Sequence, residues 1–290
     1  AMFGLLLIPV SYPKVPEGQL RVTIFDVGQG SAVLLQTAHQ NWLYDAGPRY
    51  SSDADAGARV IVPHLHYMGV RQIDTLVLSH NDQDHTGGAL SIVHALPVKR
   101  ILTSLNAVQL GQLGLANIVH DSCRSGDQYE FDGVMMAVFS PEPEALNDPQ
   151  VADNQKSCVL RFSIDHADES SLKSILLTGD MDMLTEAKMV VDTQRQNSPN
   201  EYPAIRSFHV RSGMPLQSDI IVMPHHGSDS SSSAPLIASV QPNWAVTQTG
   251  KYNAFSHPRA IVLERYQAAG AQIWRTDEQH SKVFILGEHH

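Results

Sequence analysis

The sequence predicts an α/β protein of layered, sandwich type that forms one compact domain. Short apolar runs typical of strands alternate along the chain with segments that predict helices. With 290 residues, 42% of them hydrophobic, the chain can bury a large core. Several apolar runs stop abruptly at His and Asp residues, which places these side chains on loops at strand ends, where they can converge on one point.

The predicted elements follow one another in a β-α-β rhythm. Strands are predicted at residues 21–26, 32–37, 41–45, 73–78, 129–139, 157–164, 174–178, 218–223, 244–247, 272–274 and 282–286. Helices are predicted at residues 63–69, 88–95 and 183–190 and from Pro258 onward, since proline is favoured in the first turn of a helix.

The most informative segment is His80-Asn81-Asp82-Gln83-Asp84-His85, directly after the apolar run at 73–79. Four metal-binding side chains lie within six residues there, and Gly87-Gly88 lets the backbone turn tightly behind them. Mixed imidazole and carboxylate ligands suit zinc or manganese better than calcium, which prefers oxygen. The segment predicts a metal site; the alternative is a polar loop that is merely rich in His and Asp.

Two further strand ends supply the partners of such a site. Asp180 follows the strand at 174–178 and a glycine, and its alternative role is to cap the next helix. His225-His226 follow the strand at 218–223. Adjacent residues at a strand end point in different directions, so one metal rarely binds both. We expect His226 to be the ligand and His225 to face the substrate or transfer a proton, with the reverse assignment open.

These motifs resemble a known family. The run Ser79-His80-x-Asp82-x-Asp84-His85-x-Gly87-Gly88 is similar to the metallo-β-lactamase superfamily signature, with Asp82 where a second His is usual. Together with Phe25-Asp26-Val27-Gly28-Gln29-Gly30 and Pro224-His225-His226-Gly227-Ser228, it resembles the soluble C-terminal domain of ComEC-type competence proteins, which are membrane channels that internalise DNA. The resemblance runs from about residue 19 to about residue 286 and implies a four-layer αββα sandwich.

The resemblance also implies a centre with two divalent metal ions. His80 and Asp82 would bind one ion, Asp84 and His85 would bind the other together with His226, and Asp180 would bridge the two. Asp45 resembles an aspartate that supports the metal loop. The extra His ligand that the superfamily usually places before the bridging aspartate has no matching motif. Because the first site is then poor in nitrogen, we expect manganese rather than zinc, with zinc possible.

Such a centre suits hydrolysis at phosphorus. Two metals about 3.5–4 Å apart activate a water and stabilise the attacking and leaving oxygens of an in-line displacement. We therefore expect a metal-dependent DNA nuclease, of exonuclease or phosphodiesterase type, with Asp84, Asp180, His225 and His257 as catalytic residues. By resemblance, its substrate is the strand degraded during DNA uptake in natural transformation. The alternatives are a hydrolase of small phosphodiesters or other esters and a non-catalytic module that guides DNA in a channel.

Other polar residues are candidates for substrate binding. They lie on the glycine-rich first turn, before the strand at 159, after the double histidine, and in Tyr252-Asn253-x-x-x-His257-Pro258: Asp26, Gln29, Asn154, Ser157, Ser228 and Asn253. At the N-terminus of a helix, His257 could meet an anionic oxygen. The alternatives are a helix cap for His257, strand caps for Asn154 and Ser157, and a flexible polar loop for the serines at 230–233.

Charge argues against a general DNA-binding surface. Lys and Arg number 20 and Asp and Glu 30, which gives a formal net charge of −10. Part of the acidic count would be metal ligands, but strong independent DNA binding is not expected. A single DNA strand would instead be delivered by the membrane-channel portion of the same polypeptide.

The ends of the chain and its cysteines give weaker indications. The apolar residues 1–10 have about half the length of a bilayer span and lack a basic leader. They predict either an edge strand or, as the resemblance favours, a membrane-helix stub and linker over 1–18, followed by the hydrolase domain at 19–287 on the extracytoplasmic face of the inner membrane. Residues 288–290 are expected to be a tag remnant. Cys123 and Cys158 are expected to be buried small side chains, since a disulfide would require an oxidising compartment.

Overall fold

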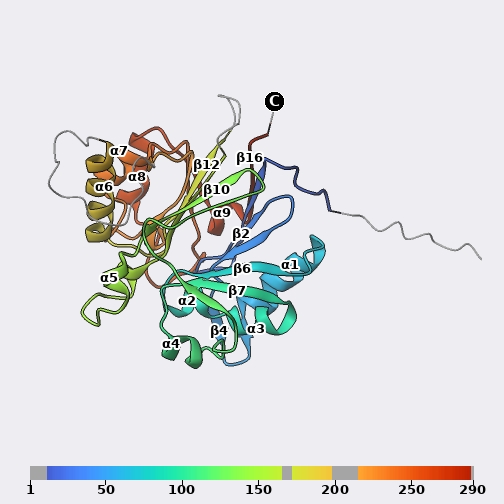
Figure 1. Ribbon diagram of the computed structural model, residues 1–290. Helices are drawn as coiled ribbons and strands as arrows, with labels where there is room; N and C mark the ends of the chain where they lie inside the picture. The colour runs from blue at the N-terminus through green and yellow to red at the C-terminus, as the bar shows by residue number, and fades with distance from the viewer. Residues whose placement is uncertain (1–11, 165–171, 198–214, 289–290) are drawn as a thin grey trace, which may run out of the picture.

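The computed structural model describes residues 12–164, 172–197 and 215–288. Two β-sheets lie face to face, and helices cover the outer side of each sheet (Figure 1). The predicted four-layer αββα architecture is confirmed. Residues 1–11 of the predicted stub and residues 289–290 of the predicted tag lie outside the described residues. Within those ranges no helix combines the length and apolar character that a membrane span requires.

The first sheet joins the beginning and the end of the domain. Its strand order is β16-β1-β2-β3-β6-β7-β8. The strands are β1 (Leu20–Ile24), β2 (Val33–Gln36), β3 (Asn41–Tyr44), β6 (Ile73–Leu78), β7 (Val98–Thr103), β8 (His120–Ser122) and β16 (Lys282–Leu286). Because β3, β6, β7 and β8 are parallel, their carboxyl ends lie at the same edge of the sheet.

The second sheet repeats this arrangement. Its order is β15-β14-β13-β12-β11-β10-β9, and β12 to β15 are parallel. The strands are β9 (Gln128–Phe131), β10 (Val134–Ser140), β11 (Val159–Ser163), β12 (Ser174–Leu177), β13 (Ile220–Val222), β14 (Trp244–Thr247) and β15 (Gln272–Arg275). A small hairpin of β4 (Arg49–Ser51) and β5 (Ala54–Asp55) lies outside both sheets.

The helices fall into two groups by chain order. The first group is η1 (Gly57–Ile61), α1 (Val62–Tyr67), α2 (Gln83–Thr86), α3 (Ala89–Ala95) and α4 (Ala107–Gln112). The second group is α5 (Pro143–Leu146), η2 (Asn154–Lys156), α6 (Met183–Asn197), η3 (Pro224–Gly227), α7 (Ala234–Val240), α8 (Ala260–Ala268) and α9 (Thr276–Gln279).

One predicted helix start was wrong. Helix α8 begins at Ala260, two residues after Pro258, and Arg259 is its N-cap with extended backbone angles. The reason is a tertiary contact: the Arg259 N–H donates to the Gly227 carbonyl at 2.9 Å, so the chain is still extended where it passes η3. His257 therefore precedes the first turn of this helix instead of lying in it.

Three hydrophobic clusters hold the layers together. The central cluster lies between the sheets and includes Leu20, Val22 and Ile24 of β1 and Phe162 of β11. The two outer clusters pack the first sheet against α1, α3 and α4 and the second against α6, α7 and α8. Strands buried on both faces read as nearly continuous apolar runs, which is why they were recognisable in the sequence.

The two cysteines correct a prediction. Both are buried, but they form a disulfide, with their Cα atoms 5.9 Å apart. Cys123 follows β8 of the first sheet and Cys158 precedes β11 of the second, so the bond joins the two sheets covalently. Their positions in the sequence gave no sign that these two strand ends meet.

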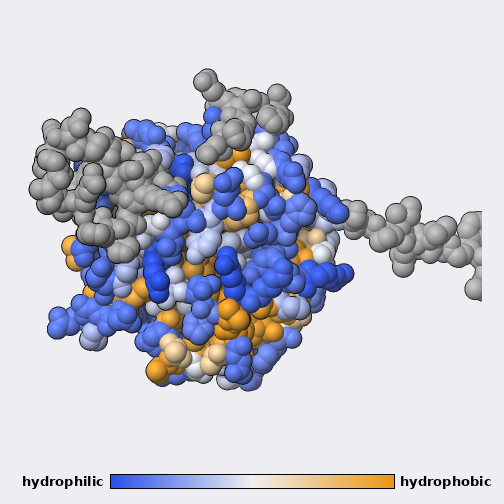
Figure 2. Space-filling model, viewed as in Figure 1, coloured by the Kyte–Doolittle hydropathy of each residue, from blue (hydrophilic) through white to orange (hydrophobic). Residues whose placement is uncertain are grey.

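Hydrophilic residues cover most of the molecular face drawn in Figure 2. Hydrophobic residues gather toward the lower part of that face, where α4 lies (Figures 1 and 2). Val108 of α4 is among the exposed large hydrophobic residues.

Candidate metal centre

The strand ends of the two sheets bring the predicted ligands together. The metal loop follows β6, Asp180 follows β12, and His225 and His226 follow β13. Two groups of metal-binding side chains result: His80, His85 and Asp180 form one, and Asp84, His85 and His226 form the other. In each group, one ligand atom per residue lies within 4.8 Å of the others.

Asp180 lies between the two groups. Its Oδ1 is 3.0 Å from His85 Nε2 and 3.6 Å from His226 Nε2. Its Oδ2 is 3.9 Å from His80 Nε2. Each oxygen thus faces a different set of imidazoles, which is the arrangement that a bridging carboxylate requires.

Three further distances suit shared coordination. His80 Nε2 is 3.3 Å from Asp82 Oδ2. His226 Nε2 is 3.2 Å from both Asp84 Oδ2 and His85 Nε2. Two ligands of one tetrahedral ion, each about 2.0–2.1 Å from it, are separated by roughly 3.3 Å. The Asp82 side chain is 48% exposed and belongs to neither group, but its contact places it beside His80 of the first group.

Hydrogen bonds to the opposite ring nitrogens orient the imidazoles. His85 Nδ1 donates to Asp45 Oδ2 at 2.7 Å, and His226 Nδ1 donates to the Gln248 carbonyl at 2.8 Å. His80 Nδ1 lies 3.0 Å from Ser79 Oγ, which itself donates to Asp45. In all three residues Nε2 is left to face the centre, as in metal sites whose outer partners fix the ring.

The buried polar atoms fit divalent cations. Among the described residues, His80 Nε2 and Asp180 Oδ1 are buried without a hydrogen-bond partner. Asp180 Oδ1 is within ion-pair distance of His85 but is not aligned for a hydrogen bond. Burial of a polar atom without a partner costs free energy. Two such atoms in one cluster of ligands are therefore consistent with a site that binds a divalent cation.

The pKa values of His85 and Asp180 are shifted in opposite directions. Burial alone would lower the pKa of His85, but the carboxylates of Asp180 and Asp45 outweigh it and raise this pKa well above its usual value. Burial would raise the pKa of Asp180, but His85 and His226 hold it well below its usual range. The carboxylates of this centre are therefore ionised at neutral pH.

His225 and His257 form a second pair of imidazoles beside the centre. His225 Nε2 is 3.6 Å from Asp180 Oδ2, and the His225 and His257 rings are 5.7 Å apart. His225 and His226 both have positive φ, 50° and 55°, and this unusual backbone turns the adjacent rings in different directions. Burial and the neighbouring His225 lower the pKa of His257 to about 4, so its ring is neutral at neutral pH.

Two predicted substrate-binding residues use their side chains for hydrogen bonds to the backbone. Asn253 Nδ2 donates to the His257 carbonyl at 2.7 Å, and the His257 N–H donates to Asn253 Oδ1 at 2.9 Å. Ser157 is fully buried, and its Oγ accepts the Asp180 N–H at 3.0 Å. Ser157 thus contacts the backbone of Asp180 and is not open to a substrate.

The other candidates differ in burial and in their contacts. The Asp26 backbone N–H donates to Ser281 Oγ at 2.9 Å, and Gln29 Oε1 is buried without a hydrogen-bond partner in the described part of the chain. Asn154 begins the short helix η2 and is partly buried. Ser228 is buried, with its Oγ 2.9 Å from Ser230 Oγ, which in turn lies 3.2 Å from His225 Nδ1.

The serine run is not a flexible polar loop. Ser231 and Ser232 are fully buried, and Ser233 caps α7 with its side chain. Glu186 of α6 accepts the backbone N–H groups of Ser232 and Ser233 at 2.6 and 2.8 Å. Neither Glu186 nor Gln248 was recognisable in the sequence as part of this region, and Gln248 contacts His226 through a backbone carbonyl, which leaves no side-chain signal.

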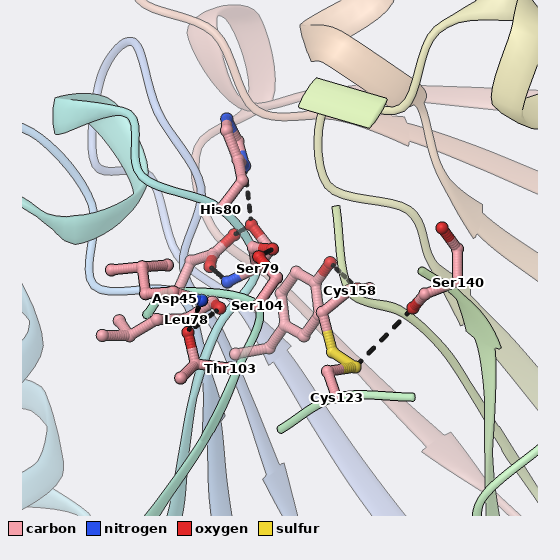
Figure 3. The surroundings of a disulfide bond; sticks show 11 residues. Asp45, Leu78, Ser79, His80, Thr103, Ser104, Cys123, Ser140 and Cys158 are labelled. Atoms are coloured by element: carbon pink, nitrogen blue, oxygen red, sulfur yellow. Dashed lines mark hydrogen bonds between the residues drawn. A yellow bond between two sulfur atoms is a disulfide. The ribbon is translucent and has the colours of Figure 1, made fainter. Parts of the chain in front are cut away.

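The disulfide lies next to the centre. Cys158 N donates to the Ser79 carbonyl at 2.9 Å, and the Cys158 carbonyl accepts from Tyr44 Oη at 2.7 Å. Figure 3 shows Cys158 beside Ser79 and Asp45 on one side and bonded to Cys123 on the other. Since Ser157 holds Asp180 and Ser79 precedes His80, one short segment connects the disulfide to both groups of ligands.

Comparison with known proteins gives the family. Residues 25–121 match the profile of the metallo-beta-lactamase superfamily. The chain belongs to this superfamily. The fold agrees, because the metallo-beta-lactamase fold protein YhfI from Bacillus subtilis superimposes with a TM-score of 0.53 over 92% of this chain and 99% of that one, at 11% identity.

This superfamily member is also similar to bacterial competence proteins over nearly its whole length. It is 34% identical to the competence protein ComA of Neisseria gonorrhoeae over 280 residues, which are 96% of this chain and 34% of that protein. It is 28% identical to the ComE operon protein 3 of Bacillus subtilis (strain 168) over 281 residues, 90% of this chain and 32% of that protein. The chain thus spans about a third of the length of these relatives.

Proposed function

We propose that this metallo-β-lactamase domain is a metal-dependent nuclease that hydrolyses DNA phosphodiester bonds and degrades the strand that is not transported during natural transformation. The observation that carries the proposal is Asp180, whose two oxygens face two different groups of ligands. A centre with two divalent ions suits in-line displacement at phosphorus. Similarity to proteins named for competence supports DNA as the substrate.

The side chains of the centre provide ligands for two divalent ions. His80 and Asp82 would hold the first ion, and Asp84, His85 and His226 would hold the second, with Asp180 between them. His85 lies in both groups, but its Nε2 has a single lone pair and can bind one ion only. When bound, the ions supply activation of water and stabilisation of charge at phosphorus. We propose manganese because the first ion would be bound by a single imidazole, that of His80, beside carboxylates. Zinc is the alternative.

His225 and His257 would act on the substrate. His225 lies beside Asp180, His257 contacts His225, and neither belongs to a group of ligands. In this proposal His225 transfers a proton and His257 donates its N–H to a phosphate oxygen. Asp26, Gln29, Asn154 and Ser228 would line the approach to the centre. Asn253 and Ser157 would act indirectly, because their side chains hold His257 and Asp180 in place.

The setting of the domain is part of the proposal. The relatives are about three times as long as this chain, which supports residues 19–287 as one domain of a larger polypeptide whose membrane-channel portion delivers a single DNA strand. The disulfide supports a position on the extracytoplasmic, periplasmic face, since disulfides persist in oxidising compartments.

A cleavage assay tests the activity. DNA labelled at the 5′ or 3′ end, single- or double-stranded, is incubated with the purified protein and manganese, zinc or magnesium added separately. We expect shortening with manganese. Intact DNA with turnover of a small phosphodiester would instead indicate a small-ester hydrolase. No turnover of either substrate by protein that binds two metals would indicate a guiding module.

The proposed role of His257 has its own test. His257→Ala should slow cleavage by about 100-fold or more while metal content stays near that of the wild type, because the ring faces the substrate and not the ions. Elemental analysis and kinetics of the same preparation check this. A loss of metal in proportion to the loss of rate would show that His257 supports the metal centre instead.

A further inference from the structure

Three exposed aromatic side chains lie on segments that contact His257 or the glycine-rich first turn, and the proposed function does not yet use them. Tyr252 is 91% exposed, Phe255 is 59% exposed and Tyr50 is 44% exposed. We call these three residues the aromatic rim.

The rim connects directly to the centre on the side of Phe255. The Phe255 ring stacks on the His257 ring, with centroids 5.7 Å apart and planes inclined by 27°. The His257 ring contacts His225, whose Nε2 is 3.6 Å from Asp180 Oδ2. One face of Phe255 is thus fixed by an imidazole that borders the centre, and the ring remains largely open to solvent.

The glycine-rich first turn connects the other two residues of the rim to the metal loop. A side chain at Gly250 would meet the backbone N of Gln29 at 2.9 Å, so the loop that carries Tyr252 packs on that turn. On the other side of the turn, Tyr50 donates from its hydroxyl to the Val27 carbonyl at 2.8 Å, which fixes its ring. The Ser31 N–H donates to the Asp84 carbonyl at 3.0 Å, which ties the same turn to the metal loop.

Cationic side chains alternate with the rings. Arg49 precedes Tyr50 and Lys251 precedes Tyr252, with Lys251 Nζ 6.0 Å from the Tyr252 ring centroid. Arg259, exposed, follows His257 by two residues. Although the chain as a whole is acidic, these three cations lie within two residues of Tyr50, Tyr252 or His257 in the sequence.

We infer that the aromatic rim binds the bases of a single-stranded DNA next to the scissile phosphate, which rests on the proposed nuclease function. Aromatic rings interleaved with cations are the recurring way to bind single strands without reading sequence, because every base has a face that can stack. Phe255 would stack the base nearest to the metals, and Tyr252 and Tyr50 would stack bases farther along the strand. Arg49, Lys251 and Arg259 would contact the phosphates between them.

The same geometry disfavours a duplex. In double-stranded DNA the bases are paired and stacked on each other, so their faces are not free for Phe255 or Tyr252 unless a base is flipped out at a cost. The rim therefore sets a preference for single strands that the metal centre alone does not have.

The test compares two substrates in two proteins. One substrate is a single-stranded oligodeoxynucleotide, and the other has the same backbone with abasic positions on both sides of the cleaved bond. The variant is Tyr252→Ala/Phe255→Ala, and the matched control is Tyr67→Ala. Tyr67 is 73% exposed on α1, beside the start of β6 and thus at the end of the sheet opposite to the metal loop.

For the wild type and the control, removal of the bases should raise KM about fivefold or more, which corresponds to the loss of one stacked base. The double variant should have this higher KM with both substrates, with unchanged metal content and kcat. Its preference for single- over double-stranded DNA should fall as well.

Three other results would overturn the inference. If KM for the intact strand is the same in the double variant and the wild type, the rim does not stack bases, while the nuclease proposal stands. If the double variant loses metal or loses kcat equally on both substrates, the loop only supports the centre. If the wild-type protein neither cleaves nor binds the intact strand under any metal, the proposed function itself fails.

Discussion

At the scale of single residues, the centre depends on carboxylates that are ionised in spite of burial. Burial would raise the pKa of Asp84, but a hydrogen bond from His226 and the charge of His85 lower it to about 2. Asp180, fully buried, is held ionised in the same way. Such a cluster keeps its negative charge at neutral pH and would therefore attract divalent cations strongly.

This charge makes two substitutions decisive. Asp84→Ala and Asp180→Ala should each abolish hydrolysis and sharply reduce bound metal, because one removes a terminal oxygen ligand and the other the oxygens shared between the groups. Elemental analysis of purified variants measures the effect. Asp53→Ala, a change at an exposed aspartate of the β4–β5 hairpin, serves as the control. Undiminished metal in both variants would rule out this ligand assignment.

Asp82 is expected to determine the preference between metals. It stands where the superfamily signature usually has His, and it lies 3.3 Å from His80 Nε2. Asp82→His should move the optimum from manganese toward zinc, because imidazole suits zinc better than carboxylate does. Activity profiles over a series of divalent ions measure the shift, with Asp53→His as the control for an added surface histidine. An identical profile in Asp82→His and the wild type would remove the argument for manganese.

The site residues that the sequence predicts differ in a physical way from those that only the structure reveals. His80, Asp82, Asp84, His85, Asp180 and His226 were recognisable because each follows an apolar run, and a strand end is a local signal. Gln248 acts through its carbonyl oxygen, which every residue has. Ser157 was noticed, but its contact with Asp180 depends on how two distant segments pack.

At the scale of elements, the strands were easier to predict than the helices between them. Strands buried on both faces, such as β6 and β12, end in apolar runs, Leu76-Val77-Leu78 and Ile175-Leu176-Leu177. The predicted strands omitted β7, whose Val98-Lys99-Arg100 start is polar, and the serines before α7 were interpreted as a loop although Ser231 and Ser232 are buried. The disulfide was not predictable for the same reason, because it depends on the meeting of β8 and β11, which only the assembled sheets bring about.

The disulfide gives a prediction about the link between the sheets. It closes a loop with a sequence separation of 35, so its removal in Cys123→Ala/Cys158→Ala should lower the free energy of unfolding by about 2–4 kcal/mol. Metal affinity should fall too, because Cys158 donates to Ser79 just before the metal loop and follows Ser157, which holds Asp180.

Denaturant unfolding and metal titration of the double variant measure the two effects separately. Wild-type protein treated with a phosphine reductant should behave like the variant, which separates the bond from the loss of side-chain volume. Equal stability and equal metal affinity with and without the bond would show that the two sheets hold the centre without it.

At the scale of the whole molecule, charge and proposed substrate are in apparent conflict. The formal net charge is −10, and DNA is a polyanion. Local charges would resolve this conflict. Divalent ions would offset the carboxylates of the centre, and in the proposed binding mode Arg49, Lys251 and Arg259 would contact the phosphates. A nuclease that receives its strand from a channel has no need of an extended basic surface.

This arrangement predicts a modest salt dependence of DNA cleavage. Contacts from about three cations to a single strand give a slope of about −2 for log affinity against log salt, so KM should rise roughly fourfold for each doubling of salt while kcat stays constant. Lys251→Gln should make the slope shallower by about 0.7, since one phosphate contact is lost. Lys188→Gln, a change at an exposed lysine of α6, should leave it unchanged. Steady-state kinetics over a range of potassium chloride concentrations measure both slopes. A slope as steep as that of proteins with six to ten phosphate contacts would mean that DNA crosses a larger surface than the one around the metal centre.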